Sequence, residues 1–110
     1  MSSRETIAFD YRGNQITISA EELQSVTNFT RALNHDIRAS IINLLSSRGE
    51  LGVTDIYRAL SIEQSIASQQ LRILWRAGVV TDRRDSKYVF YQLNRPRLVA
   101  VARVIKLLAS

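Results

Sequence analysis

One stretch of the sequence, residues 64–77, constrains the fold strongly because its two helical faces have opposite character. Ala67, Leu71 and Leu74 recur at i, i+4 and i+7, which predicts one side packed against a core. Gly78 follows, a residue that tolerates the left-handed backbone at a helix end. Another face carries only hydroxyl, amide and guanidinium groups, from Ser65, Ser68, Gln69, Arg72 and Arg76. This helix must bury one side and expose the other.

Two short strands are predicted immediately after this helix, over residues 79–84 and 87–93, with Asp85-Ser86 as the link. The second contains a Tyr-Val-Phe-Tyr run of strong strand formers. The tip of the hairpin brings three cations together: Arg83, Arg84 and Lys87. A helix with a polar and basic face, followed by a basic hairpin, is the order of elements in a winged helix-turn-helix.

Apolar spacing predicts four further helices, over residues 19–34, 37–48, 55–60 and 95–110. Caps are expected at Ser19 with Glu22, at Thr54 and at Asn94. Period-2 alternation over residues 6–18, around Gly13-Asn14, predicts a short hairpin. The expected fold is mainly α with a small β-wing: a winged helix-turn-helix of five helices and a two-stranded hairpin, with an extra N-terminal β-hairpin. Residues 1–18 form an arm or hairpin packed on the domain of residues 19–110.

Positive charge is concentrated in the last third of the chain. The net charge is +5, but residues 72–110 hold nine basic side chains against Asp82 and Asp85, a net charge of +7. A basic balance of this kind indicates a polyanionic partner, with nucleic acid first and an anionic membrane surface second. The chain has no cysteine, which excludes disulfides, thiol catalysis and thiolate metal sites.

The polar face and the basic hairpin suit double-stranded DNA. A helix fits the major groove, where Gln and Arg side chains pair with base edges. Cations and hydroxyls hold phosphates, which fixes the register and supplies most of the affinity. We assign base reading to Gln64, Ser65, Ser68, Gln69 and Arg72. Phosphate or minor-groove contact is assigned to Arg76, Arg83, Arg84 and Lys87.

The last helix predicts a partner subunit. Its residues from 98 to 108 are apolar on nearly all sides, and a helix of this kind is normally buried. At the end of a small domain the available cover is a second chain. Residues 19–110 are therefore expected to be both a DNA-binding and a dimerisation domain.

Several runs between residues 31 and 93 occur in the order and spacing of a known family: 32–38, 50–56, 64–71, 76–80 and 88–93. In these runs the chain resembles the ArsR/SmtB-type winged-helix repressors of bacteria. The resemblance implies a homodimer built on the first and last helices, bound to a pseudo-palindromic operator until an effector releases it. The interface residues would be Leu23, Val26, Leu98, Val101, Ala102, Ile105 and Leu108.

Two departures from that family concern metal sensing. Metal-sensing relatives place cysteines where this chain has Gly52 and Thr54, and others use carboxylates and His on the last helix, where residues 95–110 have none. One His without Cys does not supply the usual transition-metal ligand sets. We interpret His35, the only histidine, as a helix-junction residue. No metal and no cofactor are expected, and the effector is left open.

The sequence also bears on catalysis and on other kinds of binding. A Ser-His-Asp triad would have to use His35, and the scattered glycines form no phosphate-binding loop, so no enzyme is expected. The alternative is a winged-helix protein-interaction module whose basic face docks an acidic partner; another is a regulator controlled by a small organic ligand.

Arg103 and Lys106 interrupt the longest apolar stretch, and residues 1–5 do not begin a secretory signal. A cytoplasmic bacterial protein is expected, associated with the nucleoid when bound to DNA.

Overall fold

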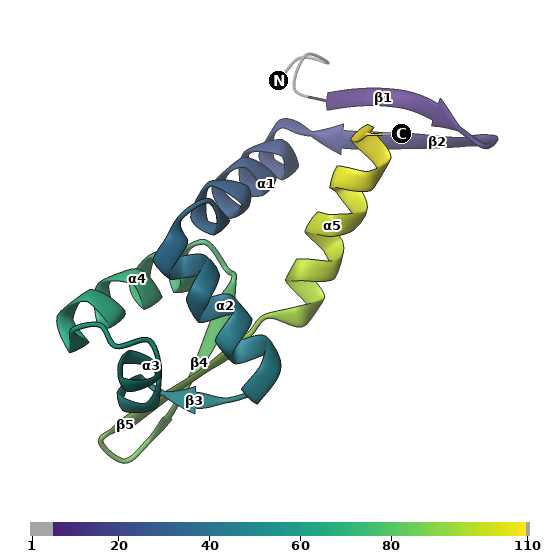
Figure 1. Cartoon of the computed structure of the whole chain (residues 1–110). Coiled ribbons are helices and arrows are strands. Elements are labelled where there is room, and N and C mark those ends of the chain that lie inside the picture. Colours follow the sequence, from purple (N-terminus) through teal and green to yellow (C-terminus); the bar gives the residue numbers. More distant parts are fainter. Residues whose placement is uncertain (1–5, 110) are drawn as a thin grey trace.

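The computed structural model of the chain describes residues 6–109 and contains five helices and five strands there (Figure 1). This confirms the predicted mainly helical winged helix-turn-helix with an additional N-terminal hairpin. The elements, in chain order, are β1 (Thr6–Tyr11), β2 (Asn14–Ser19), α1 (Ala20–Leu33), α2 (Asp36–Arg48), β3 (Leu51–Gly52), α3 (Val53–Ala59), α4 (Gln64–Arg76), β4 (Val80–Asp85), β5 (Tyr88–Leu93) and α5 (Arg95–Ala109).

The wing is a three-stranded antiparallel sheet in the order β3-β5-β4. The short strand β3 was not predicted; Leu51 pairs with Tyr91, and Gly52 with Phe90. Because β4 runs one residue further than predicted, the link is Ser86-Lys87 rather than Asp85-Ser86. Ser86 takes a positive φ of 59°, which a two-residue hairpin turn requires.

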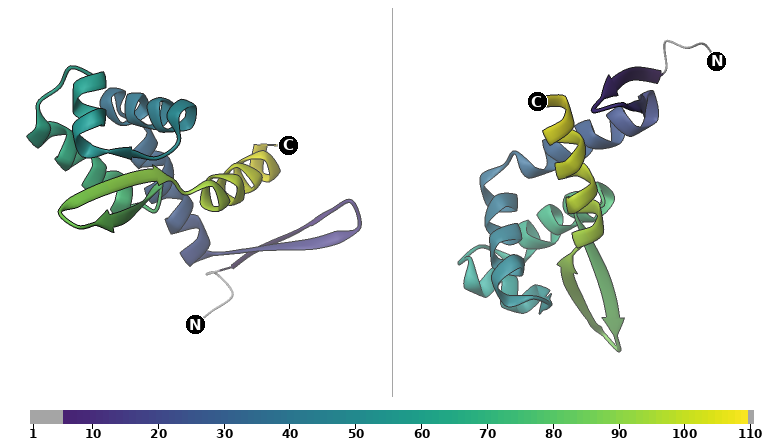
Figure 2. Two further views of the ribbon diagram at one scale, coloured as in Figure 1. Left: turned by 90° about the horizontal axis from the view of Figure 1, so that it is seen from below. Right: turned by 90° about the vertical axis from the view of Figure 1, so that its right-hand side faces the viewer.

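The N-terminal hairpin pairs β1 with β2 and forms a separate two-stranded sheet. Its turn is Arg12-Gly13 rather than Gly13-Asn14, and both residues have positive φ, 51° and 81°. Ile18 is buried, whereas Ile7, its partner in the register, is 45% exposed. The hairpin projects from the body of the protein near the end of α5 (Figure 2). Residues 1–5 of the predicted arm lie outside the described residues.

The helix ends largely follow the predicted signals. Ser19 and Glu22 form the capping box of α1, and His35 caps α2 by accepting a hydrogen bond from the Ile37 amide at Nδ1. The prediction of Thr54 as a cap was wrong: α3 begins at Val53, directly after β3, so Gly52 is its N-cap. Thr54 therefore lies inside the first turn.

The core lies beneath α4 and joins α1, α2, α3 and the base of the wing. The largest fully buried side chains are Phe29, Ile41, Leu45, Ile56, Leu71, Leu74, Val79 and Val80. At the end of α4, Gly78 has φ +81°, and the amide of Val79 donates to the Leu74 carbonyl at 2.9 Å. This geometry is a Schellman motif, and it turns the chain directly from α4 into β4. The wing is thereby fixed beside the exposed side of α4.

Candidate nucleic-acid interface

The polar face of α4 lies on the outside of the protein. Ala67, Leu71 and Leu74 are fully buried and hold the opposite side of the helix in the core, as predicted. Four of the five side chains assigned to base reading are exposed and one, Ser68, is half-buried; the full set is Gln64, Ser65, Ser68, Gln69 and Arg72. The structure thus brings all five together on the solvent side of one helix.

A cleft of about 440 Å³ lies between α4 and the wing. Arg72 and Arg76 line it from α4, and Arg84 lines it from β4, so three guanidinium groups share its walls. The one carboxylate among its lining residues is Asp82. An excess of cations in a concave surface attracts a polyanion and raises its local concentration.

The carboxylate of Asp82 accepts a hydrogen bond from a tryptophan of α4. Trp75 Nε1 in α4 donates a hydrogen bond of 2.9 Å to Asp82 Oδ1 in β4. The Trp75 side chain is half exposed, so this bond adds a polar link between α4 and the wing to the buried contacts at the base of β4. Tyr91 lines the same cleft, and burial, together with the charge of Asp82, raises the pKa of its hydroxyl. No local pattern in the sequence predicts a role for Trp75 or Asp82, because their contact depends on the turn at Gly78.

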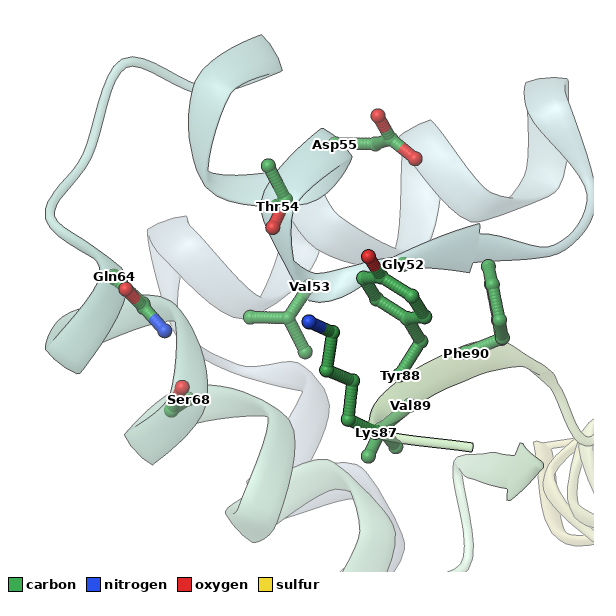
Figure 3. Close-up of a pocket in the computed structure, with 10 residues that line it drawn as sticks. All are labelled: Gly52, Val53, Thr54, Asp55, Gln64, Ser68, Lys87, Tyr88, Val89 and Phe90. Carbon is green, nitrogen blue, oxygen red and sulfur yellow. The ribbon is translucent and has the colours of Figure 1, made fainter. Parts of the chain in front are cut away.

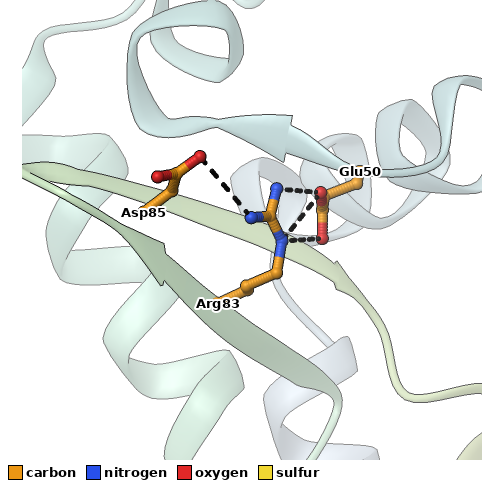
Figure 4. A network of polar contacts seen from close by, with 3 residues as sticks. All are labelled: Glu50, Arg83 and Asp85. Atoms are coloured by element: carbon orange, nitrogen blue, oxygen red, sulfur yellow. Dashed lines mark hydrogen bonds and ion pairs between the residues drawn. The ribbon is translucent and has the colours of Figure 1, made fainter.

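Arg83 points to the opposite side of the wing, because successive residues of a strand face opposite ways. Its guanidinium group donates three hydrogen bonds to the carboxylate of Glu50, the shortest 2.7 Å, and lies 3.9 Å from Asp85 (Figure 4). Its Cζ also lies 4.8 Å from the centroid of the Phe90 ring. The hydrogen bonds from Arg83 hold the pKa of Glu50 below its ordinary value and raise that of Arg83. The three cations of the wing therefore do not share one face.

Lys87, at the wing tip, lines a second cleft, of about 540 Å³, between the wing and the first turns of α3 and α4. Its side chain extends into this cleft toward Val53, and its Nζ lies 5.7 Å from the centroid of the Tyr88 ring (Figure 3). Thr54 borders the same cleft from α3 and is exposed. From the sequence, Thr54 was expected to cap a helix rather than to border this cleft; the pairing of β3 with β5 brings it here. Lys87 and Arg84 therefore lie at the two clefts between wing and α4.

Comparison with known proteins agrees with this geometry. The sequence profile described as "Bacterial regulatory protein, arsR family" matches residues 35–82, the segment from the start of α2 to β4. An uncharacterized HTH-type transcriptional regulator of Mycobacterium tuberculosis is 40% identical over 84 residues, which cover 70% of this chain and 70% of that protein. The chain therefore belongs to the arsR family.

Two further proteins are similar to this chain over most of its length. The biofilm growth-associated repressor of Xylella fastidiosa is 33% identical over 72 residues, 66% of this chain and 62% of that protein. This chain thus matches less than two thirds of that repressor's length. The solution structure of a homodimeric winged helix-turn-helix DNA-binding domain from Mycobacterium bovis superposes with a TM-score of 0.66 at 30% identity, covering 79% of this chain and 82% of that one.

The last helix, α5, packs only sparsely against the other elements of the described chain. Val101, one of the predicted interface residues, is 5% exposed and packs in the core of the single chain. Leu23, Val26 and Leu98 are half-buried. Ala102, Ile105 and Leu108 are exposed at the far part of α5. The structure thus leaves an apolar surface on the outer half of α5.

Residues 6–109 show no group of three or more His, Cys, Asp or Glu side chains placed to hold a metal ion. His35 lies at the junction of α1 and α2, where its Nδ1 caps α2. Among the same residues, no helix combines the length and the apolar character needed to cross a bilayer.

Proposed function

We propose that this chain is a sequence-specific DNA-binding transcriptional regulator and, more narrowly, a homodimeric repressor. One observation carries the proposal: the exposed side of α4 bears no carboxylate, and Arg84 of the wing shares a cationic cleft with it. Membership of a family of bacterial regulatory proteins supports it.

On DNA, α4 would lie in the major groove. Gln64, Gln69 and Arg72 would pair with base edges, Arg72 with guanine, and the hydroxyls of Ser65 and Ser68 would bond to bases or phosphates. The other cations would hold the backbone: Arg76, Arg84 and Lys87. We assign Arg83 a different task, because its guanidinium group is bound to Glu50: it positions the wing.

Dimerisation would cover the apolar outer half of α5. Ile105 is 43% and Leu108 50% exposed, a cost that a second chain removes by burying them. Two copies of α4 would then enter successive major grooves about 34–36 Å apart.

The proposed regulator uses neither catalysis nor the metal and thiol sensor sites of its family, and it acts in the bacterial cytoplasm. Binding of double-stranded DNA, rather than of an acidic protein, is what the carboxylate-free face favours. Its basic groups alternate with amides and hydroxyls that match base edges.

Fluorescence anisotropy with the duplex upstream of its own gene tests the proposal. The protein should bind this duplex at least about a thousandfold more tightly than an unrelated duplex of equal length, the lower end of the range of specific DNA-binding proteins. If substitution by alanine of Gln69, Arg72, Arg76, Arg84 and Lys87 together leaves the affinity unchanged, the assigned surface is wrong. A chain that is monomeric by light scattering at micromolar concentration and binds no duplex would favour the protein-interaction module.

A further inference from the structure

Gln70 is the one polar residue buried among residues 6–109, and it lies in α4 between the exposed Gln69 and the buried Leu71. Its side chain points into the protein, where its Oε1 accepts a hydrogen bond of 2.8 Å from Arg38 Nη1 of α2. Its burial was not predicted from the sequence, because an amide next to Gln69 is expected to belong to the polar face. Its position on the buried side of the helix needs a physical reason.

Arg38 joins three helices through one guanidinium group. In addition to Gln70 of α4, its Nε donates a hydrogen bond of 2.6 Å to the carbonyl oxygen of Ala32, near the end of α1. Arg38 itself lies in the first turn of α2. The cleft around it is lined by Arg31 and Arg76 and by no carboxylate, so Arg38 is held there by two neutral acceptors.

The two hydrogen bonds of Arg38 restrain the rotation of α4 about its own axis. The hydrophobic effect that buries Leu71 and Leu74 is non-directional, so burial alone does not select one angle of α4 about its axis. A rotation of about 20° moves side-chain ends roughly 6 Å from the axis by about 2 Å, enough to break a hydrogen bond to a base. A hydrogen bond with a charged donor is directional and strong, and leaving its buried partner unpaired is costly.

We propose that Arg38 is a positioning residue that sets the rotation of α4 through Gln70 and ties it to the end of α1. This inference rests on the proposed DNA-binding function and adds a specificity-determining contact away from the DNA. Because α1 carries Leu23 and Val26 of the proposed dimer interface, the same group connects dimer packing with the angle of α4.

The experiment compares Gln70→Leu, which replaces the amide with an apolar side chain of comparable volume, with Gln70→Glu, which keeps an acceptor. Arg31→Met is the matched control, since it removes a cation from the same cleft without touching Gln70. Each variant is measured by anisotropy for its affinity ratio between operator and unrelated duplex, and by thermal unfolding to verify that it is folded.

Gln70→Leu should lower the affinity ratio by about tenfold, the loss of one good base contact, with affinity for the unrelated duplex unchanged within about twofold. Gln70→Glu and Arg31→Met should keep the ratio. Arg38→Met should lower it as Gln70→Leu does, and the double variant should lose no more than either single one. A folded Gln70→Leu protein with an unchanged ratio, or equal losses in Gln70→Leu and Gln70→Glu, overturns the proposal.

Amide hydrogen exchange separates this inference from the proposed function. If the wild-type protein does not discriminate between duplexes, the proposed function falls. The positioning role is then still decided by exchange: Gln70→Leu should speed exchange along residues 64–76 by several-fold more than Gln70→Glu does. Equal exchange in the two variants counts against the role of Arg38.

Discussion

At the scale of single residues, adjacent arginines of the wing differ in what they touch. Arg83 and Arg84 are neighbours in β4, yet one is bound to Glu50 and the other lines the cleft beside Arg72. The pleat of the strand makes this separation, and a net charge alone does not reveal it. Substitutions at the two positions therefore report on different roles.

Arg84→Ala should weaken binding to all duplexes alike and reduce the slope of log affinity against log salt by about one, because one phosphate contact is lost. Arg83→Ala should change that slope less, because its charge already faces a carboxylate. Anisotropy titrations at several salt concentrations measure both slopes. Equal changes in slope for the two variants would contradict the assigned orientations.

The pairing of Glu50 with Arg83 also gives a pH dependence with a definite sign. Because the folded protein lowers the pKa of Glu50 from its ordinary 4.5, the pair stabilises the fold above that pH and loses its effect as pH falls through the lowered value. The melting temperature of the wild type should therefore fall more between pH 6 and pH 3 than that of Glu50→Gln. Glu63→Gln, at an exposed site directly before α4, is the control. A Glu50→Gln protein with the wild-type pH profile would contradict this linkage.

At the scale of elements, the junction between α4 and β4 determines the relation of wing to helix. Gly78→Ala forces a side chain into the left-handed region and should destabilise the fold by about 1–2 kcal/mol. The cost arises from the backbone, since an added Cβ would meet only Arg97, at 3.8 Å. Urea unfolding measures the loss. Gly78→Asn, which tolerates this conformation better, should lose less, and an equal loss would point to crowding instead.

Elements with local signals were predictable, and contacts across elements were not. The capping box of Ser19, the apolar spacing in α4 and the glycine at its end are each set by neighbouring residues, so the sequence shows them. The strand β3 has two residues and no periodicity, and it exists because β5 pairs with it. The bonds of Gln70 with Arg38 and of Trp75 with Asp82 likewise depend on packing that no local pattern encodes.

At the scale of the whole molecule, the proposed regulator consists of two chains that pair through α5. Ile105→Asp and Leu108→Asp each place a charge on the exposed apolar part of α5, so they should convert a dimer to a monomer without unfolding the chain. Light scattering measures the mass, and circular dichroism verifies the helices. Ser40→Asp, on an exposed position of α2, is the control and should remain dimeric. Dimers that survive both substitutions on α5 would place the interface elsewhere.

The central claim, that the polar face of α4 lies in the major groove, is tested most directly by dimethyl sulfate footprinting, because N7 of guanine is exposed in that groove. The wild-type protein should protect guanines in two patches centred one helical turn apart, and Arg72→Ala should lose protection at specific guanines in each patch. Binding that protects the backbone from hydroxyl radicals but leaves every guanine N7 open would contradict the claim.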